Sequence, residues 1–117
     1  METAEQITSL VRDQLALIED KKIAKRIGEL LVSPYPSERG WDYGRPDEKF
    51  VCWMVLEHRE SNTGIAFCSQ GFGPKNPWGL LFIEGPYMSM GMDSGWYSTL
   101  EWTFRESMAY EDSTSTG

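Results

Sequence analysis

The stretch Phe50-Val51-Cys52-Trp53-Met54-Val55-Leu56 decides the fold, together with the two apolar runs that follow it at 65–68 and 78–83. Successive side chains of an extended strand point to opposite faces, so this stretch carries apolar side chains on both faces. A strand that is apolar on both faces is typical of a sheet that is covered on both sides. We therefore expect these runs to form three antiparallel strands, with a short fourth strand around 87–92.

A hairpin turn is predicted at residues 60–64, because the turn contains Asn and Gly, which accept positive φ angles. If Glu60 pairs with Ile65, the same register puts Cys52 and Cys68 about five residue pairs apart, roughly 16 Å. A disulfide needs Cα atoms within about 7 Å of each other. The two cysteines are therefore expected to be buried reduced thiols, and this favours a cytoplasmic protein.

Two amphipathic helices are predicted before the strands. Thr3 and Gln6 form a capping box that is followed by apolar residues at helical spacing. A second apolar stripe, at 23–31, lies on about the opposite side of a continuous helix, so either the helix breaks or its two ends pack oppositely. We favour a break at which Asp20 caps a second helix that ends before Ser33.

A long connection runs from Ser33 to Glu48 and contains three prolines, two glycines, Trp41 and Tyr43. A connection of this length in a compact domain is usually functional or is packed by its own side chains. We expect a loop whose aromatic residues, Trp41 and Tyr43, cover the core. The alternative is that Trp41 lines a groove beside the glycine- and proline-rich loop before Trp78.

The C-terminal region begins with a second capping box at 98–101, which predicts a helix through Leu100, Phe104 and Met108. Residues 111–117 have no hydrophobic periodicity and are expected to form a disordered tail. Residues 1–110 are therefore expected to form a single α+β domain. It has an N-terminal helix or helix pair, a three- to four-stranded mainly antiparallel sheet and a C-terminal helix, with helices on both sheet faces.

The charge of the chain is −7 and is concentrated towards the C-terminus. Residues 85–117 contain one basic and five acidic residues, whereas residues 1–32 contain five basic and six acidic ones. Binding to nucleic-acid phosphates needs clustered Lys and Arg, so we expect no nucleic-acid partner. No apolar run approaches the roughly 20 residues of a membrane-spanning helix, so we expect no membrane association. The acidic balance favours a basic protein partner.

Catalytic chemistry is not indicated by any motif. His58 is the only histidine and is expected at a solvated strand end, while Cys52 and Cys68 are expected to lie too far apart to complete a zinc site with it. The glycine-rich loop at 71–79 lacks the Gly-Lys-Ser/Thr ending of a phosphate-binding loop. We therefore predict no catalytic residues, no metal and no cofactor.

Five segments spread over residues 53–96 resemble a group of small uncharacterised bacterial proteins. They are WMVLEH at 53–58, SNTGIA at 61–66, GFGP at 71–74, PWGL at 77–80 and SMGMDSGW at 89–96. This resemblance implies no activity. In size and acidity the chain is also similar to immunity proteins of bacterial toxin systems, and that similarity implies an inhibitor that binds a protein.

The function predicted from these observations is binding without catalysis, by an acidic and aromatic surface that docks on a basic protein. The residues expected to contact the partner are Trp41, Trp78, Trp96, Asp93 and Glu101. The alternative is a small ligand-binding or hydrolase-like domain that uses a cleft around Trp41, Trp78 and Asp93. A third alternative is a homodimer that buries the second apolar face of the sheet.

Overall fold

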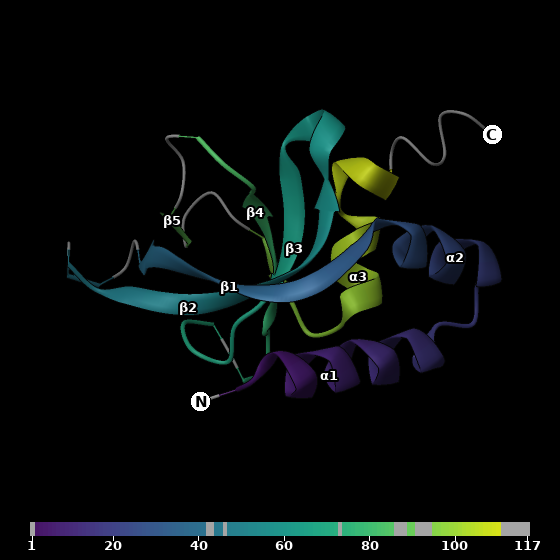
Figure 1. Cartoon of the computed structure of the whole chain (residues 1–117), viewed down its shortest axis with the longest axis horizontal. Coiled ribbons are helices and arrows are strands. Elements are labelled where there is room, and N and C mark those ends of the chain that lie inside the picture. Colours follow the sequence, from purple (N-terminus) through teal and green to yellow (C-terminus); the bar gives the residue numbers. More distant parts are fainter. Residues whose placement is uncertain are drawn as a thin grey trace.

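The computed structural model describes residues 2–41, 44–45, 47–72, 74–85 and 95–110, and the backbone of 89–90. The described chain forms three α-helices, one short 3-10 helix and one six-stranded sheet with the strand order β5-β1-β2-β3-β4-β6 (Figure 1). The elements are α1 (Ala4–Leu17), α2 (Lys21–Leu30), β1 (Leu31–Trp41), β2 (Lys49–His58), η1 (Arg59–Ser61), β3 (Thr63–Phe67), β4 (Trp78–Phe82), β5 (Ser89–Met90), β6 (Trp96–Tyr97) and α3 (Leu100–Arg105). The predicted α+β class is confirmed.

Strand β2 lies inside the sheet between β1 and β3, and its side chains enter two separate apolar clusters. Trp53 and Val55 point to the face covered by α1, α2 and α3, whereas Cys52 and Met54 point to the other face. We expected helices on both faces, and this expectation is wrong. The second face is covered by aromatic side chains from the strands themselves, namely Trp41, Phe50 and Trp96.

The predicted helix pair is confirmed, including both caps. The Thr3 hydroxyl accepts a hydrogen bond from the Gln6 amide, and the Gln6 side chain accepts one from the Thr3 amide. Asp20 caps α2 by accepting from the amides of Lys22 and Ile23. The break between the helices lets both apolar stripes face the same cluster, because α2 starts with a new orientation.

The connection expected at 33–48 is mostly a strand, so that expectation is wrong. β1 pairs antiparallel with β2 along most of its length, and the two strands form a long ribbon whose far end lies opposite α2 (Figure 1). Pro34 and Pro36 fit because the pairing shifts between Leu31 and Tyr35, and because β5 pairs only with Gly40 and Trp41 of the described β1 residues. Proline lacks an N–H group, and strand edges and bulges are where that group is not needed.

The hairpin between β2 and β3 turns two residues earlier than predicted, with His58 paired to Thr63, and a register shift between Met54 and Leu56 then pairs Met54 with Ala66. Asn62 takes the left-handed backbone conformation, with φ 58°, so that the turn closes before Gly64. Gly64 lies inside β3 instead, where an added Cβ would come 2.4 Å from the Leu56 carbonyl oxygen. The glycine is therefore needed for close strand contact and not for the turn.

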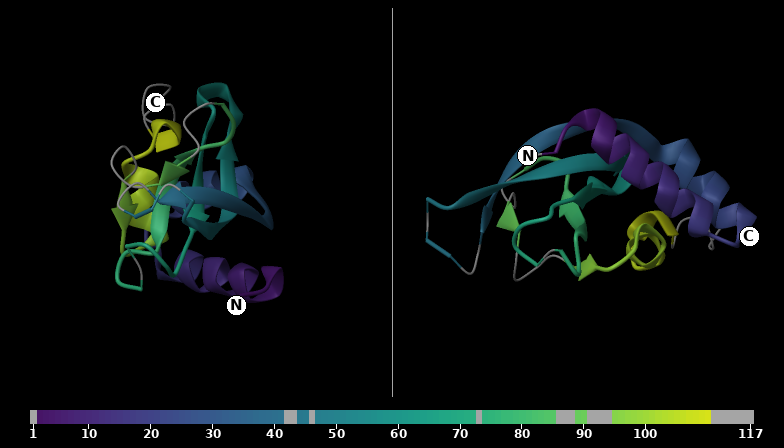
Figure 2. Two further views of the ribbon diagram at one scale, coloured as in Figure 1. Left: turned by 90° about the vertical axis from the view of Figure 1, so that its left-hand side faces the viewer. Right: turned by 90° about the horizontal axis from the view of Figure 1, so that it is seen from below.

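The sheet curves around the helical side, as the two further views show (Figure 2). Short β6 pairs with the start of β4, where the Trp96 ring lies over Gly79. α3 follows β6 directly and contacts both β4 and β6. This places α3 next to the β4 side of the sheet, away from the long β1–β2 ribbon (Figure 2).

Replacing Gly79 by Ala should destabilise the protein by about 1–3 kcal/mol, because the new Cβ would overpack a filled site. It would lie 2.4 Å from ring atoms of Trp96. Gly28→Ala is the matched control, since no atom lies within 4 Å of the added Cβ and the position is an exposed helical one. The control should be stabilised by roughly 0.5–1 kcal/mol. Urea unfolding of both variants measures the difference, and equal midpoints would contradict this packing.

Tyr35 should lose its proton at a higher pH in the folded protein than in the unfolded chain. The free energy of unfolding should therefore depend on pH in the alkaline range. Burial, followed by the hydrogen bond that its hydroxyl donates to Glu57 Oε2 at 2.6 Å, raises the pKa of Tyr35 from 10.0 to about 12. The folded state thus favours the protonated phenol, so this contribution is complete below pH 10 and is lost as pH rises towards 12. Tyr35→Phe should flatten the decline in urea midpoint over that range, and an unchanged decline would contradict the assignment.

Candidate functional site

The tryptophans predicted to contact a partner do not share one surface. Trp78 is 2 % exposed and packs edge-on against Phe67 on the helical face, so its prediction as a contact residue is wrong. Trp41 and Trp96 lie on the other face of the sheet. The predicted cleft between Trp41 and Trp78 is therefore wrong as well, because the sheet separates them, and Asp93 lies outside the described residues.

Trp41 and Trp96 are joined through Phe72. The Phe72 ring centroid lies 5.1 Å from that of Trp41 and 6.2 Å from that of Trp96. All three side chains are partly buried, and Trp41 and Trp96 pack against the second cluster of the sheet while Phe72 bridges their rings. They therefore act first as a cover for this apolar face, as expected for Trp41, whereas Tyr43 lies outside the described residues.

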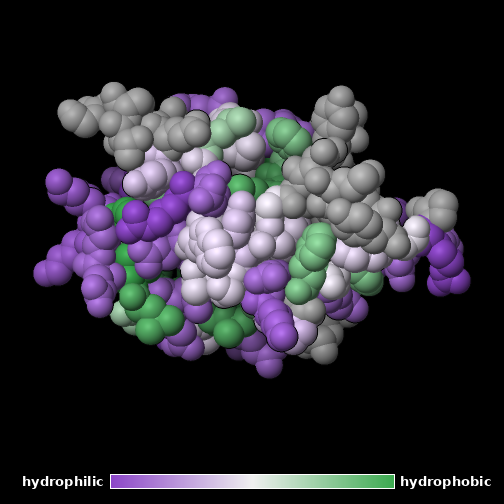
Figure 3. Space-filling model, turned by 180° about the vertical axis from the view of Figure 1, so that it is seen from behind, coloured by the Kyte–Doolittle hydropathy of each residue, from purple (hydrophilic) through white to green (hydrophobic). Residues whose placement is uncertain are grey.

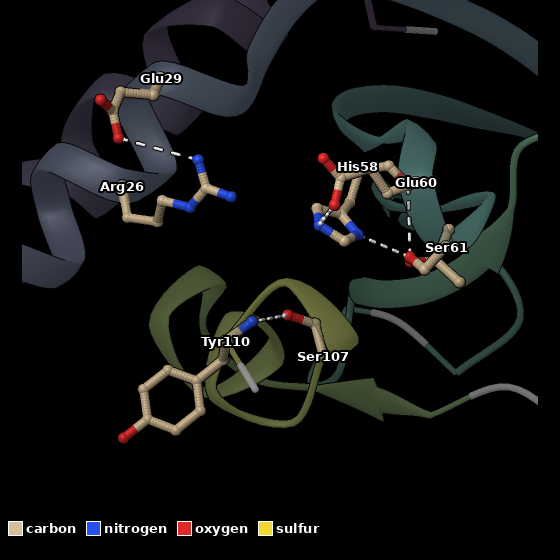
Figure 4. A network of polar contacts seen from close by, with 8 residues as sticks. Arg26, Glu29, His58, Glu60, Ser61, Ser107 and Tyr110 are labelled. Atoms are coloured by element: carbon tan, nitrogen blue, oxygen red, sulfur yellow. Dashed lines mark hydrogen bonds and ion pairs between the residues drawn. The ribbon is translucent and has the colours of Figure 1, made fainter. Parts of the chain in front are cut away.

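The C-terminal helix is shorter than predicted, because it breaks at Ser107. α3 is capped by the Thr99 hydroxyl, which accepts from the Trp102 amide, and it ends at Arg105. The Ser107 hydroxyl then donates to the Phe104 carbonyl at 2.6 Å and accepts from the Tyr110 amide at 3.2 Å (Figure 4). Serine often ends a helix in this way, because its side chain competes for backbone hydrogen bonds.

The break changes the environment of Met108. We expected Met108 on the buried stripe of a continuous helix, but its side chain is 53 % exposed, so this expectation is wrong. Together with the exposed side of β4 it forms a pocket of about 180 Å³. The pocket is lined by Thr63, Leu80, Leu81, Phe82, Glu106, Ser107 and Met108. Its walls are therefore largely apolar, with one carboxylate.

Trp102 lies on the exposed side of α3 and is 52 % exposed. Its ring contacts Tyr97 at a centroid distance of 5.3 Å. Burial, and then the negative charge of Glu106, raise the pKa of Tyr97. Glu106 therefore lies close enough to Tyr97 to raise its pKa, and it also lines the pocket. We call the surface formed by Phe82, Trp102, Glu106 and Met108 the α3–β4 patch.

Charges beside the α3–β4 patch are mostly acidic. Glu101 accepts two hydrogen bonds from the Arg105 guanidinium, at 3.0 and 2.9 Å, and this carboxylate raises the pKa of Arg105. Arg105 is thus engaged by Glu101, the one predicted contact residue that lies on α3. Figure 3 shows the side of the molecule that carries α3, where side chains of intermediate hydropathy occupy the centre and hydrophilic ones surround much of it.

His58 is buried, with 4 % exposure, so the prediction of a solvated strand end is wrong. Its Nδ1 lies 2.7 Å from Ser61 Oγ, and that oxygen lies 2.6 Å from Thr63 Oγ1 (Figure 4). A histidine beside a serine hydroxyl can accept its proton in nucleophilic catalysis. Here the serine hydroxyl also donates to the His58 carbonyl oxygen at 3.3 Å, so these polar contacts hold the residues of the hairpin turn together. We assign it a structural role.

The residues that sequence reasoning missed are Phe82, Trp102 and Met108. Phe82 lies in a run expected to be a strand and Met108 on the apolar positions of a predicted helix, where residues are normally buried, and Trp102 was expected only to flank those positions. A signal was present in Ser107, because a residue type that favours helix caps stands just before the end of the predicted helix. The exposure of Phe82, at 39 %, has no comparable sequence signal.

In the described part of the chain, no group of three or more His, Cys, Asp or Glu side chains is arranged to hold a metal ion. The helices described there are too short or too polar to span a membrane. We also compared the chain with models of protein families, with curated proteins and with solved structures, and none of the three comparisons found a match.

Proposed function

We propose that this protein is a non-catalytic, acidic inhibitor of the immunity type that docks on a basic protein through the α3–β4 patch. The observation that carries the proposal is the half exposure of Trp102 and Met108 beside an apolar pocket with a carboxylate at Glu106. Tryptophan is enriched at the centres of protein interfaces, and methionine adapts to varied partner surfaces. The partner then supplies an apolar anchor residue with a basic neighbour.

The size of the pocket supports a protein partner over a small-molecule ligand. Its volume of about 180 Å³ is below the ~300–1,000 Å³ of typical ligand sites. A space of this size suits one inserted side chain. Leu80, Phe82 and Met108 offer that side chain apolar contacts, while Trp102, one helical turn before the pocket residue Glu106, adds an exposed flat surface on the same side of α3. An inserted anchor within a rim of weaker contacts is the usual arrangement of a binding hot spot.

Charge supports a basic partner. Glu106 lines the pocket and the nearby Arg105 is paired with Glu101, so the local surface keeps a net negative charge. The whole chain carries −7, and a second acidic copy would therefore be repelled, which speaks against the homodimer. Electrostatic attraction of a basic protein raises the association rate and weakens as salt increases.

We also propose that the protein acts in the cytoplasm. The two cysteines are buried and are not joined in a disulfide, which suits a reducing compartment. The alternative function of a ligand-binding or hydrolase-like domain has less support, because Trp41 and Trp78 lie on opposite faces of the sheet.

The experiment starts with affinity capture from source cells by the tagged protein, at low salt and at about 0.5 M salt. We expect a basic protein that is bound at low salt and lost at high salt. With that partner purified, Trp102→Ala should raise the Kd about thirtyfold, since loss of a hot-spot side chain removes about 2 kcal/mol. Calorimetry measures the Kd, and an unchanged value would show that the interface lies elsewhere.

A pair of charge-matched variants serves as the control. Glu106→Gln and Glu5→Gln each remove one exposed carboxylate, but Glu5 lies in the first turn of α1, outside the α3–β4 patch. The first variant should slow association several-fold and the second should have little effect. Equal effects would indicate unspecific attraction by net charge. Failure to capture any protein at either salt concentration would contradict the proposed function.

A further inference from the structure

The two cysteines lie opposite each other in the sheet, and this corrects the separation expected from the sequence. The observed pairing of Trp53 with Phe67 and of Met54 with Ala66 sets the register. Extending it by one residue beyond Trp53 and Phe67 places Cys52 opposite Cys68. Both side chains belong to the second cluster of the sheet, and both are almost fully buried.

The backbone hydrogen bonds show that Cys52 and Cys68 form a non-hydrogen-bonded pair of the antiparallel strands. The Cys68 amide donates to the Pro77 carbonyl at 2.8 Å, so its hydrogen-bonding groups face β4 and not β2. Residues whose backbone groups point away from the neighbouring strand form the close, non-hydrogen-bonded pairs, with Cα atoms about 4.5 Å apart. Disulfides bridge Cα distances of about 4.4–6.8 Å. The backbone geometry at Cys52 and Cys68 is therefore within reach of a disulfide.

The two thiols already interact in the reduced protein. The hydrogen bond from the Cys52 thiol to the Cys68 sulfur raises the pKa of Cys52 and lowers that of Cys68. The Gln70 backbone also donates to Cys68 and favours its thiolate. The buried guanidinium of Arg39 lies on the same face, donates to Met54 Sδ at 3.8 Å, and favours the Cys52 thiolate. The net effect is a lowered pKa for Cys68 and a raised pKa for Cys52, so Cys68 is the thiol that more readily gives the nucleophilic thiolate.

We infer that Cys52 and Cys68 form a reversible disulfide when the protein meets a small peroxide oxidant. The Cys68 thiolate attacks one peroxide oxygen, the O–O bond breaks, and the product is a Cys68 sulfenic acid with release of the first water after protonation. The Cys52 sulfur then attacks the Cys68 sulfur, its proton leaves, and the S–OH bond breaks to give the second water. Two thiols lose two electrons and hydrogen peroxide gains them.

The disulfide would join β2 to β3 on the sheet face away from the helices. It would close a loop that includes the whole β2–β3 hairpin and its turn, and cross-links of this kind stabilise by restricting the unfolded chain. The oxidised protein should therefore unfold at a temperature at least about 5 °C higher than the reduced one. The burial of both thiols means that a local opening has to admit the oxidant, so the reaction should be slow.

The test treats the full-length reduced protein with hydrogen peroxide and then with a maleimide in denaturant. We expect a mass that is lower by two hydrogen atoms, no maleimide uptake, and a single cross-linked peptide joining Cys52 to Cys68 after digestion. Dithiothreitol should restore the uptake of two maleimides, and calorimetry should show the rise in unfolding temperature. Two maleimides taken up after prolonged oxidation, or cross-links only between molecules, would overturn the inference.

The single variants Cys52→Ser and Cys68→Ser identify the attacking thiol. Cys52→Ser leaves the Cys68 thiol, which should stop at a sulfenic acid that dimedone traps. Cys68→Ser leaves the Cys52 thiol, which should react with dimedone several-fold more slowly. The peptide map of the wild-type protein decides the inference even if a variant does not fold. Oxidation of unfolded wild-type protein in urea is the control for thiol access, and a Cys52–Cys68 disulfide that forms there but never in the folded protein would overturn the inference.

Discussion

The structure depends on the burial of β2 on both of its faces. An interior strand with Trp53 and Val55 on one side and Cys52 and Met54 on the other needs two covers, and the protein supplies them differently. Helices cover the first face, because α1, α2 and α3 each present an apolar stripe to it. Aromatic side chains cover the second face. Each cover removes apolar surface from water, which is the main stabilising contribution to folding.

The two faces of the sheet carry different candidate sites. The aromatic cover of Trp41, Phe72 and Trp96 is partly buried and encloses the cysteine pair, so its shape follows from packing. The helical cover is complete over the core but ends early, at Arg105. Met108 lies beyond that point and is exposed, and Trp102 is exposed on the outer side of α3 itself. The helical side thus carries the surface on which we propose that a partner docks, whereas the aromatic side covers the cysteine pair.

Two small backbone features decide where these sites form. The left-handed Asn62 closes the β2–β3 turn two residues earlier than expected, with Gly64 inside β3, and the register shift between Met54 and Leu56 then brings Cys52 opposite Cys68. Ser107 ends the regular helix through hydrogen bonds to Phe104 and Tyr110, and this turns Met108 outward. In both cases a local change in the backbone moves side chains between core and surface. The reason is that a shift of one or two residues along a strand or helix is enough to turn a side chain to the other face.

The α+β class, the two N-terminal helices with their caps at Thr3 and Asp20, and a central strand that is apolar on both faces can all be read from the sequence. Those features follow from local patterns of apolar and capping residues. Long-range contacts set the strand role of 31–41, the register of the cysteines, the burial of His58 and Trp78, and the exposure of Trp102 and Met108. Register and exposure depend on which distant residues meet, and a periodic pattern does not contain that information.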